Sequence, residues 1–185
     1  MMNYSLKPFF LMLCLMLPLQ ATAQETAQGG VNRAEYRLAT GDTIYVRVYG
    51  EDDLTMRLAV PSDGSVDYAF VGKIQLAGKT IDDLEQEITR RLKGDYLVDP
   101  RVSVSMAEFR NFYIDGEVAK RGGFAWQPGL TVRTAISRAG GLRERASGSK
   151  WYIVPEGGTE KDRRKVSEDD IVNPGDTLII EQSFF

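Results

Sequence analysis

The stretch TGDTIYVRVYG, residues 40–50, has a shorter counterpart about 130 residues later in PGDTLIIEQSF, residues 174–184. In the first stretch, every second residue from position 44 to 48 is apolar, which is the spacing of a strand with one buried face. Glycine adopts turn conformations that other residues avoid, and aspartate accepts hydrogen bonds from nearby backbone N–H groups. Both stretches are therefore predicted to be turns that lead into a buried strand, with structural roles for Asp42 and Asp176.

The N-terminal segment MMNYSLKPFFLMLCLMLPLQATAQE has the features of a secretory signal peptide. Lys7 precedes an apolar run of 11 residues, which is shorter than the roughly 20 residues of a membrane-spanning helix. The small residues of Ala21-Thr22-Ala23 stand at the positions that a signal peptidase reads. We expect residues 1–23 to be removed by cleavage between Ala23 and Gln24, and residues 24–34 to form a flexible lead-in.

The composition excludes several classes of chemistry. The chain has no histidine, and its one cysteine, Cys14, lies in the segment that we expect to be removed. Leu11-Met12-Leu13 lacks the small residue that precedes a lipid-bearing cysteine. Disulfides, thiol nucleophiles, Ser-His-Asp triads and most zinc sites are thus excluded from the mature chain. The net charge of −3 argues against a nucleic-acid partner, and we predict no cofactor, no metal site and no catalytic residue.

The first half of the mature chain is predicted to form strands and one helix. Asp63-Gly64 is a strong turn signal, so we predict a β-hairpin over residues 55–72. Thr80 and Asp83 have the spacing of a capping box at the start of a helix. That helix is predicted to carry one apolar face and to end at Gly94, and its face consists of Ile81, Leu84, Ile88 and Leu92. A further strand follows in DPRVSVSM, residues 99–106.

The second half repeats this mixture of strands and helix. Strands are predicted at residues 112–118, 150–155 and 176–182, and a short helix is predicted to begin after Thr131 and to stop at Gly140-Gly141. Residues 156–170 carry charges of both signs and are expected to form a solvated loop. The sequence therefore predicts an α+β protein of two small domains, residues 35–109 and 110–185.

The order of these segments resembles the outer-membrane polysaccharide export (OPX) family, the Wza-like group. YRLATGDTIYVRVYGEDDL, DGSV, FVGKIQLAGKTIDDLEQEITRRL and DPRVSVSM are similar to the N-terminal export domain of that family. IDGEVAKRGGFAWQPGLTVRTAISRAGGL and VNPGDTLIIE resemble its SLBB domain, a β-grasp module. The resemblance covers residues 35–185, and it implies a mixed β-sheet and helix domain followed by a β-grasp domain.

The resemblance implies a function in capsule or exopolysaccharide export. Similar proteins form homo-oligomeric rings in the periplasm, associated with the outer membrane, and the polymer passes through them without chemical change. The implied partners are the polysaccharide and an inner-membrane polysaccharide copolymerase. Larger members add a lipid-bearing cysteine and a membrane helix that forms the outer-membrane pore. Neither is expected here, so a separate outer-membrane β-barrel channel is predicted as a further partner.

Three groups of residues are candidates for contacts. Tyr45, Arg47 and Tyr49 share one face of a strand and are candidates for binding the polymer or a neighbouring subunit; the alternative is an ordinary exposed face. The arginines around the second helix are candidates for attracting an acidic polymer, or they form a solvated basic face; they are Arg133, Arg138, Arg143 and Arg145. Phe184 and Phe185 either dock on the outer-membrane channel or cover the core of their own domain.

Two other functions are compatible with the sequence. One is a periplasmic glycan-binding adaptor that forms no closed ring. The other is a glycosidase that uses paired carboxylates, for which the adjacent acids at 51–53, 82–83 and 169–170 are the candidates. A glycosidase needs two carboxyl groups about 5–9 Å apart across a cleft, and two small domains offer little room for one.

Overall fold

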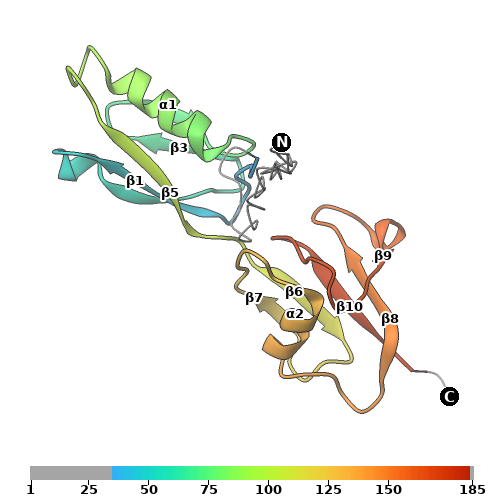
Figure 1. Ribbon diagram of the computed structural model, residues 1–185. Helices are drawn as coiled ribbons and strands as arrows, with labels where there is room; N and C mark the ends of the chain where they lie inside the picture. The colour runs from blue at the N-terminus through green and yellow to red at the C-terminus, as the bar shows by residue number, and fades with distance from the viewer. Residues whose placement is uncertain (1–34, 184–185) are drawn as a thin grey trace, which may run out of the picture.

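The computed structural model describes residues 35–183 and shows two lobes joined end to end (Figure 1). One hydrophobic core is built from residues between Leu38 and Val104, and a separate one from residues between Phe112 and Ile180. Each lobe combines strands with one α-helix, which confirms the predicted α+β class with two small units. The expected cleavage site at Ala23 and Gln24, the lead-in 24–34, and Phe184 with Phe185 lie outside the described residues.

The first lobe packs a helix against a three-stranded antiparallel sheet and a small hairpin (Figure 1). The sheet has the order β2-β1-β5, and β3 pairs with β4. The elements are β1 (Thr43–Val48), the 3-10 turn η1 (Asp52–Leu54), β2 (Met56–Ala59), β3 (Ser65–Tyr68), β4 (Gly72–Gln75), α1 (Ile81–Leu92) and β5 (Val102–Glu108). Alternate residues of β1 are buried, as the period of two predicts.

The predicted hairpin over residues 55–72 is wrong, although its turn exists. Gly64 N–H donates to the Pro61 carbonyl at 2.9 Å, and Gly64 has a φ of 73°. The strands on either side do not pair with each other, because β2 pairs with β1 while β3 pairs with β4. A tight turn fixes only the reversal of the chain. Here the reversal leads from one sheet into another.

The predicted capping box begins α1 where the sequence places it. The Thr80 hydroxyl accepts from Asp83 N–H at 3.1 Å, and the Asp83 carboxylate accepts from Thr80 N–H at 3.4 Å. The predicted apolar face is buried, and it consists of Ile81, Leu84, Ile88 and Leu92. The helix ends at Leu92, and Gly94 follows with a φ of 100°. Helix signals that act within a few residues were sufficient to place this element.

The second lobe is a five-stranded sheet with the order β7-β6-β10-β8-β9. Its elements are β6 (Phe112–Gly116), β7 (Gly122–Phe124), α2 (Val132–Arg138), β8 (Ala146–Val154), the 3-10 turn η2 (Glu160–Asp162), β9 (Arg164–Lys165) and β10 (Thr177–Gln182). The first and last strands of the lobe, β6 and β10, are parallel neighbours at its centre, and the other pairs are antiparallel. This is the β-grasp arrangement.

Both tryptophans are packing residues of the second lobe. Trp126 and Trp151 belong to the core of the second lobe, and their indole N–H groups donate to the carbonyls of Val172 and Ser147, each at 2.6 Å. A buried indole needs such an acceptor, because an unpaired N–H away from water is costly.

Candidate functional site

The two Gly-Asp-Thr stretches form the same turn. In residues 39–42 and in residues 173–176, the aspartate N–H donates to the carbonyl of the first turn residue, at 3.0 and 3.2 Å. The glycine occupies the third position, with φ of 93° at Gly41 and 86° at Gly175. Each aspartate carboxylate accepts from the backbone N–H of the first turn residue at 2.9 Å. The predicted structural roles of Asp42 and Asp176 are therefore confirmed in geometry.

The two turns also meet at the junction between the lobes, which the sequence did not indicate. The connecting segment, residues 109–111, passes between them. Arg110 N–H donates to the Asp42 carboxylate at 2.9 Å, and Gly175 N–H donates to the Asn111 carbonyl at 3.0 Å. The turn of the first lobe thus binds Arg110, and the turn of the second lobe binds the adjacent Asn111. The repeated motif acts as a clamp, and we call these two turns with residues 109–111 the junction clamp.

Asp42 is the buried charge at the centre of the junction clamp. Its side chain has no exposed surface and accepts hydrogen bonds from the Tyr36 hydroxyl at 2.8 Å and from Arg110 Nη1 at 3.0 Å. The Arg110 guanidinium also pairs with Glu156 of the second lobe at 2.8 Å. A buried carboxylate needs a partner of this kind, because an unpaired charge away from water is strongly unfavourable.

The pKa values at the junction clamp reflect this arrangement. Burial raises the pKa of the Tyr36 hydroxyl, and the Asp42 carboxylate raises it further. Burial opposes the charge of Arg110, but the nearby Tyr36, Asp42 and Glu156 outweigh burial and raise its pKa. Burial also raises the pKa of Asp176, against the hydrogen bonds from Asn173 that favour its charged form. Tyr36 and Arg110 therefore keep their protons at every physiological pH.

An aromatic contact crosses the same junction. Phe109 lies edge-on to Tyr36, with ring centroids 5.3 Å apart, and edge-on to Trp126, at 4.8 Å. Tyr36 packs against the core of the first lobe, whereas Trp126 belongs to the core of the second. Aromatic pairs of this geometry contribute about 0.5–1.5 kcal/mol each beyond the burial of their surface. The charged and aromatic contacts together fix how the lobes meet.

A polar groove of about 490 Å³ opens beside the junction clamp, and Gly41, Arg110, Glu156 and Gly175 are among the residues that line it. Arg110 and Glu156 of the groove already pair with each other, and Glu108 of the groove pairs with Arg57 outside it. Within residues 35–183, no cluster of three or more metal-binding side chains occurs. In the same residues, no helix has the length and apolar character to span a bilayer.

Replacing Gly175 with valine is expected to lower the free energy of unfolding by about 1–3 kcal/mol. A Cβ atom there would lie 2.5 Å from Glu156 Cδ, so Glu156 must leave Arg110, and the φ of 86° is unfavourable for valine. Gly157→Val is the matched control, since Gly157 has a φ of 72° and open space around it. Urea unfolding measures both variants. Equal losses in the two would show that the Glu156 contact adds nothing to the backbone strain.

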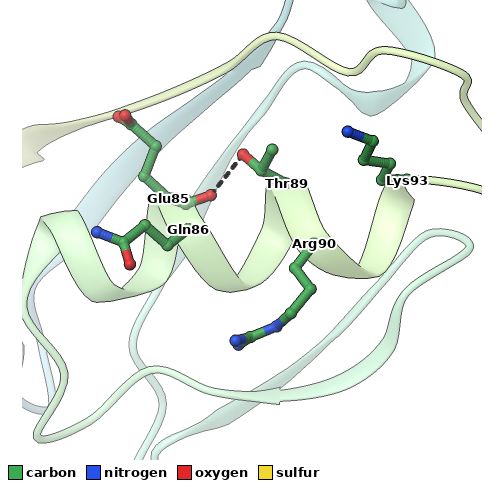
Figure 2. Close-up of a pocket in the computed structure, with 5 residues that line it drawn as sticks. All are labelled: Glu85, Gln86, Thr89, Arg90 and Lys93. Atoms are coloured by element: carbon green, nitrogen blue, oxygen red, sulfur yellow. Dashed lines mark hydrogen bonds between the residues drawn. The ribbon is translucent and has the colours of Figure 1, made fainter.

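A second groove, of about 460 Å³, lies on the solvent side of α1. Figure 2 shows its lining residues Glu85, Gln86, Thr89, Arg90 and Lys93, with the Thr89 hydroxyl donating to the Glu85 carbonyl at 2.7 Å. The Glu85 carboxylate accepts from Val104 N–H at 2.9 Å. Because β5 is an edge strand, Glu85 satisfies a backbone donor that would otherwise face an open edge. The side chains of this groove thus belong to the surface of α1 and to its contact with β5.

The predicted face of Tyr45, Arg47 and Tyr49 exists on the outer side of β1. The exposed fraction is 36% for Tyr45 and 51% for Tyr49. The Arg47 guanidinium carbon lies 5.1 Å from the centroid of the Tyr49 ring, and Arg101 adds a second guanidinium at 5.9 Å. Sequence reasoning missed Arg101 and also Arg57, which β2 places opposite Tyr45. The register between strands, and not the spacing along one strand, brings them together.

The arginines of α2 have partners within the second lobe. Arg133 forms ion pairs with Glu168 and with Asp169, the latter at 3.5 Å, and both acids come from the charged loop 156–170. Arg138 donates to the Ala125 carbonyl at 2.6 Å. Polymer binding by Arg133 and Arg138 therefore stays a prediction, and carboxylates of the chain itself already occupy Arg133.

Comparison with known proteins finds a family match for the first lobe and similarity to curated relatives over most of the chain. Residues 31–107 match the family described as "Polysaccharide biosynthesis/export protein". The chain is 34% identical over 163 residues to the exopolysaccharide production protein ExoF of Rhizobium meliloti (strain 1021), covering 80% of this chain and 38% of ExoF. It is 25% identical over 151 residues to the EPS I polysaccharide export outer membrane protein EpsA of Ralstonia solanacearum, covering 68% and 40%. The chain thus spans about two fifths of the length of these curated relatives.

Proposed function

The chain belongs to the polysaccharide biosynthesis/export family through residues 31–107, and we propose that it is a component of an exopolysaccharide export machine and not an enzyme. The observation that carries the proposal is the similarity to ExoF, which extends over 163 residues. The similarity therefore reaches beyond the matched family region. The two lobes, which the sequence predicts to be an export domain and an SLBB domain, are proposed to act as one unit in this machine.

The proposed place of the protein is the periplasm, in association with the outer membrane. Copies of the chain form a ring, and the polysaccharide moves through it from an inner-membrane copolymerase toward an outer-membrane channel. The junction clamp supports this proposal, because a conduit must keep a constant shape while a polymer moves past it. Buried ion pairs and aromatic contacts across the junction hold the lobes in one arrangement.

An adaptor that binds glycan without forming a ring is the second proposal. The exposed face of Tyr45, Arg47 and Tyr49 would serve either function, since both need a surface that meets sugar. The two differ in assembly. Sedimentation of the full chain, alone and in detergent extracts of its own envelope, separates them: a ring sediments as a multiple of the chain mass, and an adaptor does not.

The described acids offer poor support for a glycosidase. Hydrogen bonds from Thr80 lower the pKa of Asp83, and hydrogen bonds from Ser167 lower the pKa of Asp170. The general acid of a glycosidase must instead keep its proton near neutral pH, which requires a raised pKa. Asp83 caps α1 and Asp170 closes a turn, so both acids have structural tasks.

Deleting the gene and restoring it tests the proposed function. We expect the deletion strain to release no polysaccharide into the medium and the wild-type chain to restore release. The reason is that a conduit component is needed for every polymer chain that leaves the cell. The measurement is the mass of polymer recovered from the medium per cell. Unchanged release in the deletion strain would contradict the proposal.

A further inference from the structure

The outer face of the sheet β2-β1-β5 forms one continuous surface of rings, guanidinium groups and hydroxyls. Tyr45 pairs with Arg57 on β2 and with Ser105 on β5, and Arg47 pairs with Ser103. Directly paired residues of antiparallel strands have Cβ atoms about 4.5–5.5 Å apart, so these side chains are neighbours on the face that does not bury the core. Residues two apart along a strand lie about 6.7 Å apart, which makes this surface a regular row.

Tyr49 extends the row beyond the end of β1. Its backbone N–H donates to the Arg101 carbonyl at 2.9 Å, which continues the pairing of the strands. The guanidinium groups of Arg47 and Arg101 both lie within 6 Å of the Tyr49 ring centroid, at 5.1 and 5.9 Å. Half of the Tyr49 surface is still exposed. The structure thus holds two cations beside an accessible aromatic ring.

Arg47 and Arg101 have no acidic partner in the part of the chain that the structure describes. Among residues 35–183, no carboxylate lies within ion-pair distance of Arg47 or Arg101, and this includes the acids at 51–53 that follow Tyr49. Arg57 on the same face pairs with Glu108 at 3.1 Å, and Arg133 in the other lobe has two acidic partners. Arg47 and Arg101 are therefore available to anions from outside the chain.

We propose that this face binds an acidic polysaccharide, so that the export substrate is a polymer with carboxylate or similar anionic substituents. The tyrosine rings contact the apolar C–H faces of the sugars, and Ser103 and Ser105 supply hydroxyls for their hydroxyl groups. Arg47 and Arg101 pair with the anionic substituents, since a guanidinium matches a carboxylate in a two-point geometry. The inference rests on the proposed export function and adds the chemical class of its substrate.

Calorimetric titration of the full chain with a hexamer of galacturonic acid tests the inference. We expect the carboxyl-reduced, neutral hexamer to bind at least about tenfold more weakly, because it cannot pair with the guanidinium groups. The variant Arg47→Glu with Arg101→Glu is expected to lose at least about tenfold in affinity for the acidic hexamer. The variant Arg47→Lys with Arg101→Lys keeps the positive charge but loses the planar guanidinium. Its affinity for the acidic hexamer should lie between that of the wild type and that of the glutamate variant.

The matched control is Lys120→Glu with Lys161→Glu, which makes the same change of charge at two exposed positions of the other lobe. It should alter affinity by no more than about twofold, as expected of distant, solvent-screened charges. Circular dichroism confirms that each variant is folded, and the lysine variant replaces the glutamate variant if the latter unfolds. Equal affinity for the two hexamers, an equal loss in the control, or no binding of the acidic hexamer would each overturn the inference.

Polymer release separates this inference from the function on which it rests. If the wild-type chain restores release in the deletion strain but does not bind the acidic hexamer, the substrate class is wrong and the export function stands. If the wild-type chain does not restore release, the export function itself is wrong, whatever the titration gives.

Discussion

Asp42→Ala is expected to lower the free energy of unfolding by about 3–5 kcal/mol, which is the cost of breaking a buried ion pair by removing one partner. The Asp42 carboxylate is fully buried and accepts from the Tyr36 hydroxyl, from two backbone N–H groups and from Arg110. Only 15% of the Arg110 side chain is exposed. When the Asp42 carboxylate is lost, Glu156 is the remaining carboxylate partner of the Arg110 guanidinium. Urea unfolding of the wild type and the variant gives the difference.

Asp176→Ala is the control for this prediction, because Asp176 has the same place in the equivalent turn but no cationic ion-pair partner in the described residues. We expect it to cost about 1–3 kcal/mol, since it loses hydrogen bonds from Asn173 and from the Glu156 backbone but no ion pair. The difference between the two variants isolates the contribution of Arg110. If both lose the same amount, Asp42 acts only within its own turn, and the junction clamp does not exist as a unit.

Gly116→Ala is expected to cost at least about 4 kcal/mol, or to prevent the second lobe from folding, because β6 and β10 cannot both keep their positions. Gly116 ends β6 beside β10 with a φ of 91°, and a Cβ atom there would lie 2.0 Å from the Ile180 carbonyl oxygen. The obstacle is backbone, which cannot move aside as a side chain does. The same Ile180 carbonyl accepts from Glu117 N–H at 2.9 Å, so the central parallel pair would have to separate.

Gly141→Ala separates backbone strain from this collision. Gly141 has nearly the same φ, 92°, and nothing within 4 Å of the position of a Cβ atom. We expect it to cost about 1–2 kcal/mol, the strain of a left-handed alanine alone. Thermal unfolding followed by the near-ultraviolet signal of Trp126 and Trp151 reports on the second lobe. A similar loss of stability in both variants would mean that β10 moves aside for the new methyl group at position 116.

Local signals were sufficient for much of the fold. Thr80 and Asp83 predicted the start of α1 because a capping box acts within four residues. The two Gly-Asp turns were likewise predictable, since each aspartate bonds within its own turn. The hairpin failed for the opposite reason: the partner of β3 is chosen by β4 and by the burial of Tyr68 and Ile74, and a turn at Gly64 carries no information about that choice.

The candidate sites depended on contacts that no local pattern encodes. Asp42 and Arg110 are 68 residues apart, and Tyr36 and Arg110 are 74 apart, so neither pair has a recognisable spacing. The alternation in β1 did predict a shared face for Tyr45, Arg47 and Tyr49. It could not supply Arg101, whose position follows from the register of β5 against β1. In the same way, the charged loop 156–170 neutralises Arg133 only in the folded chain.

Where the polymer accumulates tests the central claim most directly. The measurement is a pulse of labelled sugar in cells depleted of this protein, followed by size fractionation of the polymer in the envelope and in the medium. A conduit component predicts that long polymer is still made, remains in the envelope, and moves to the medium when the wild-type chain is restored. Loss or shortening of the polymer itself, with nothing retained in the envelope, would contradict the account, because the protein would then act in synthesis and not in export.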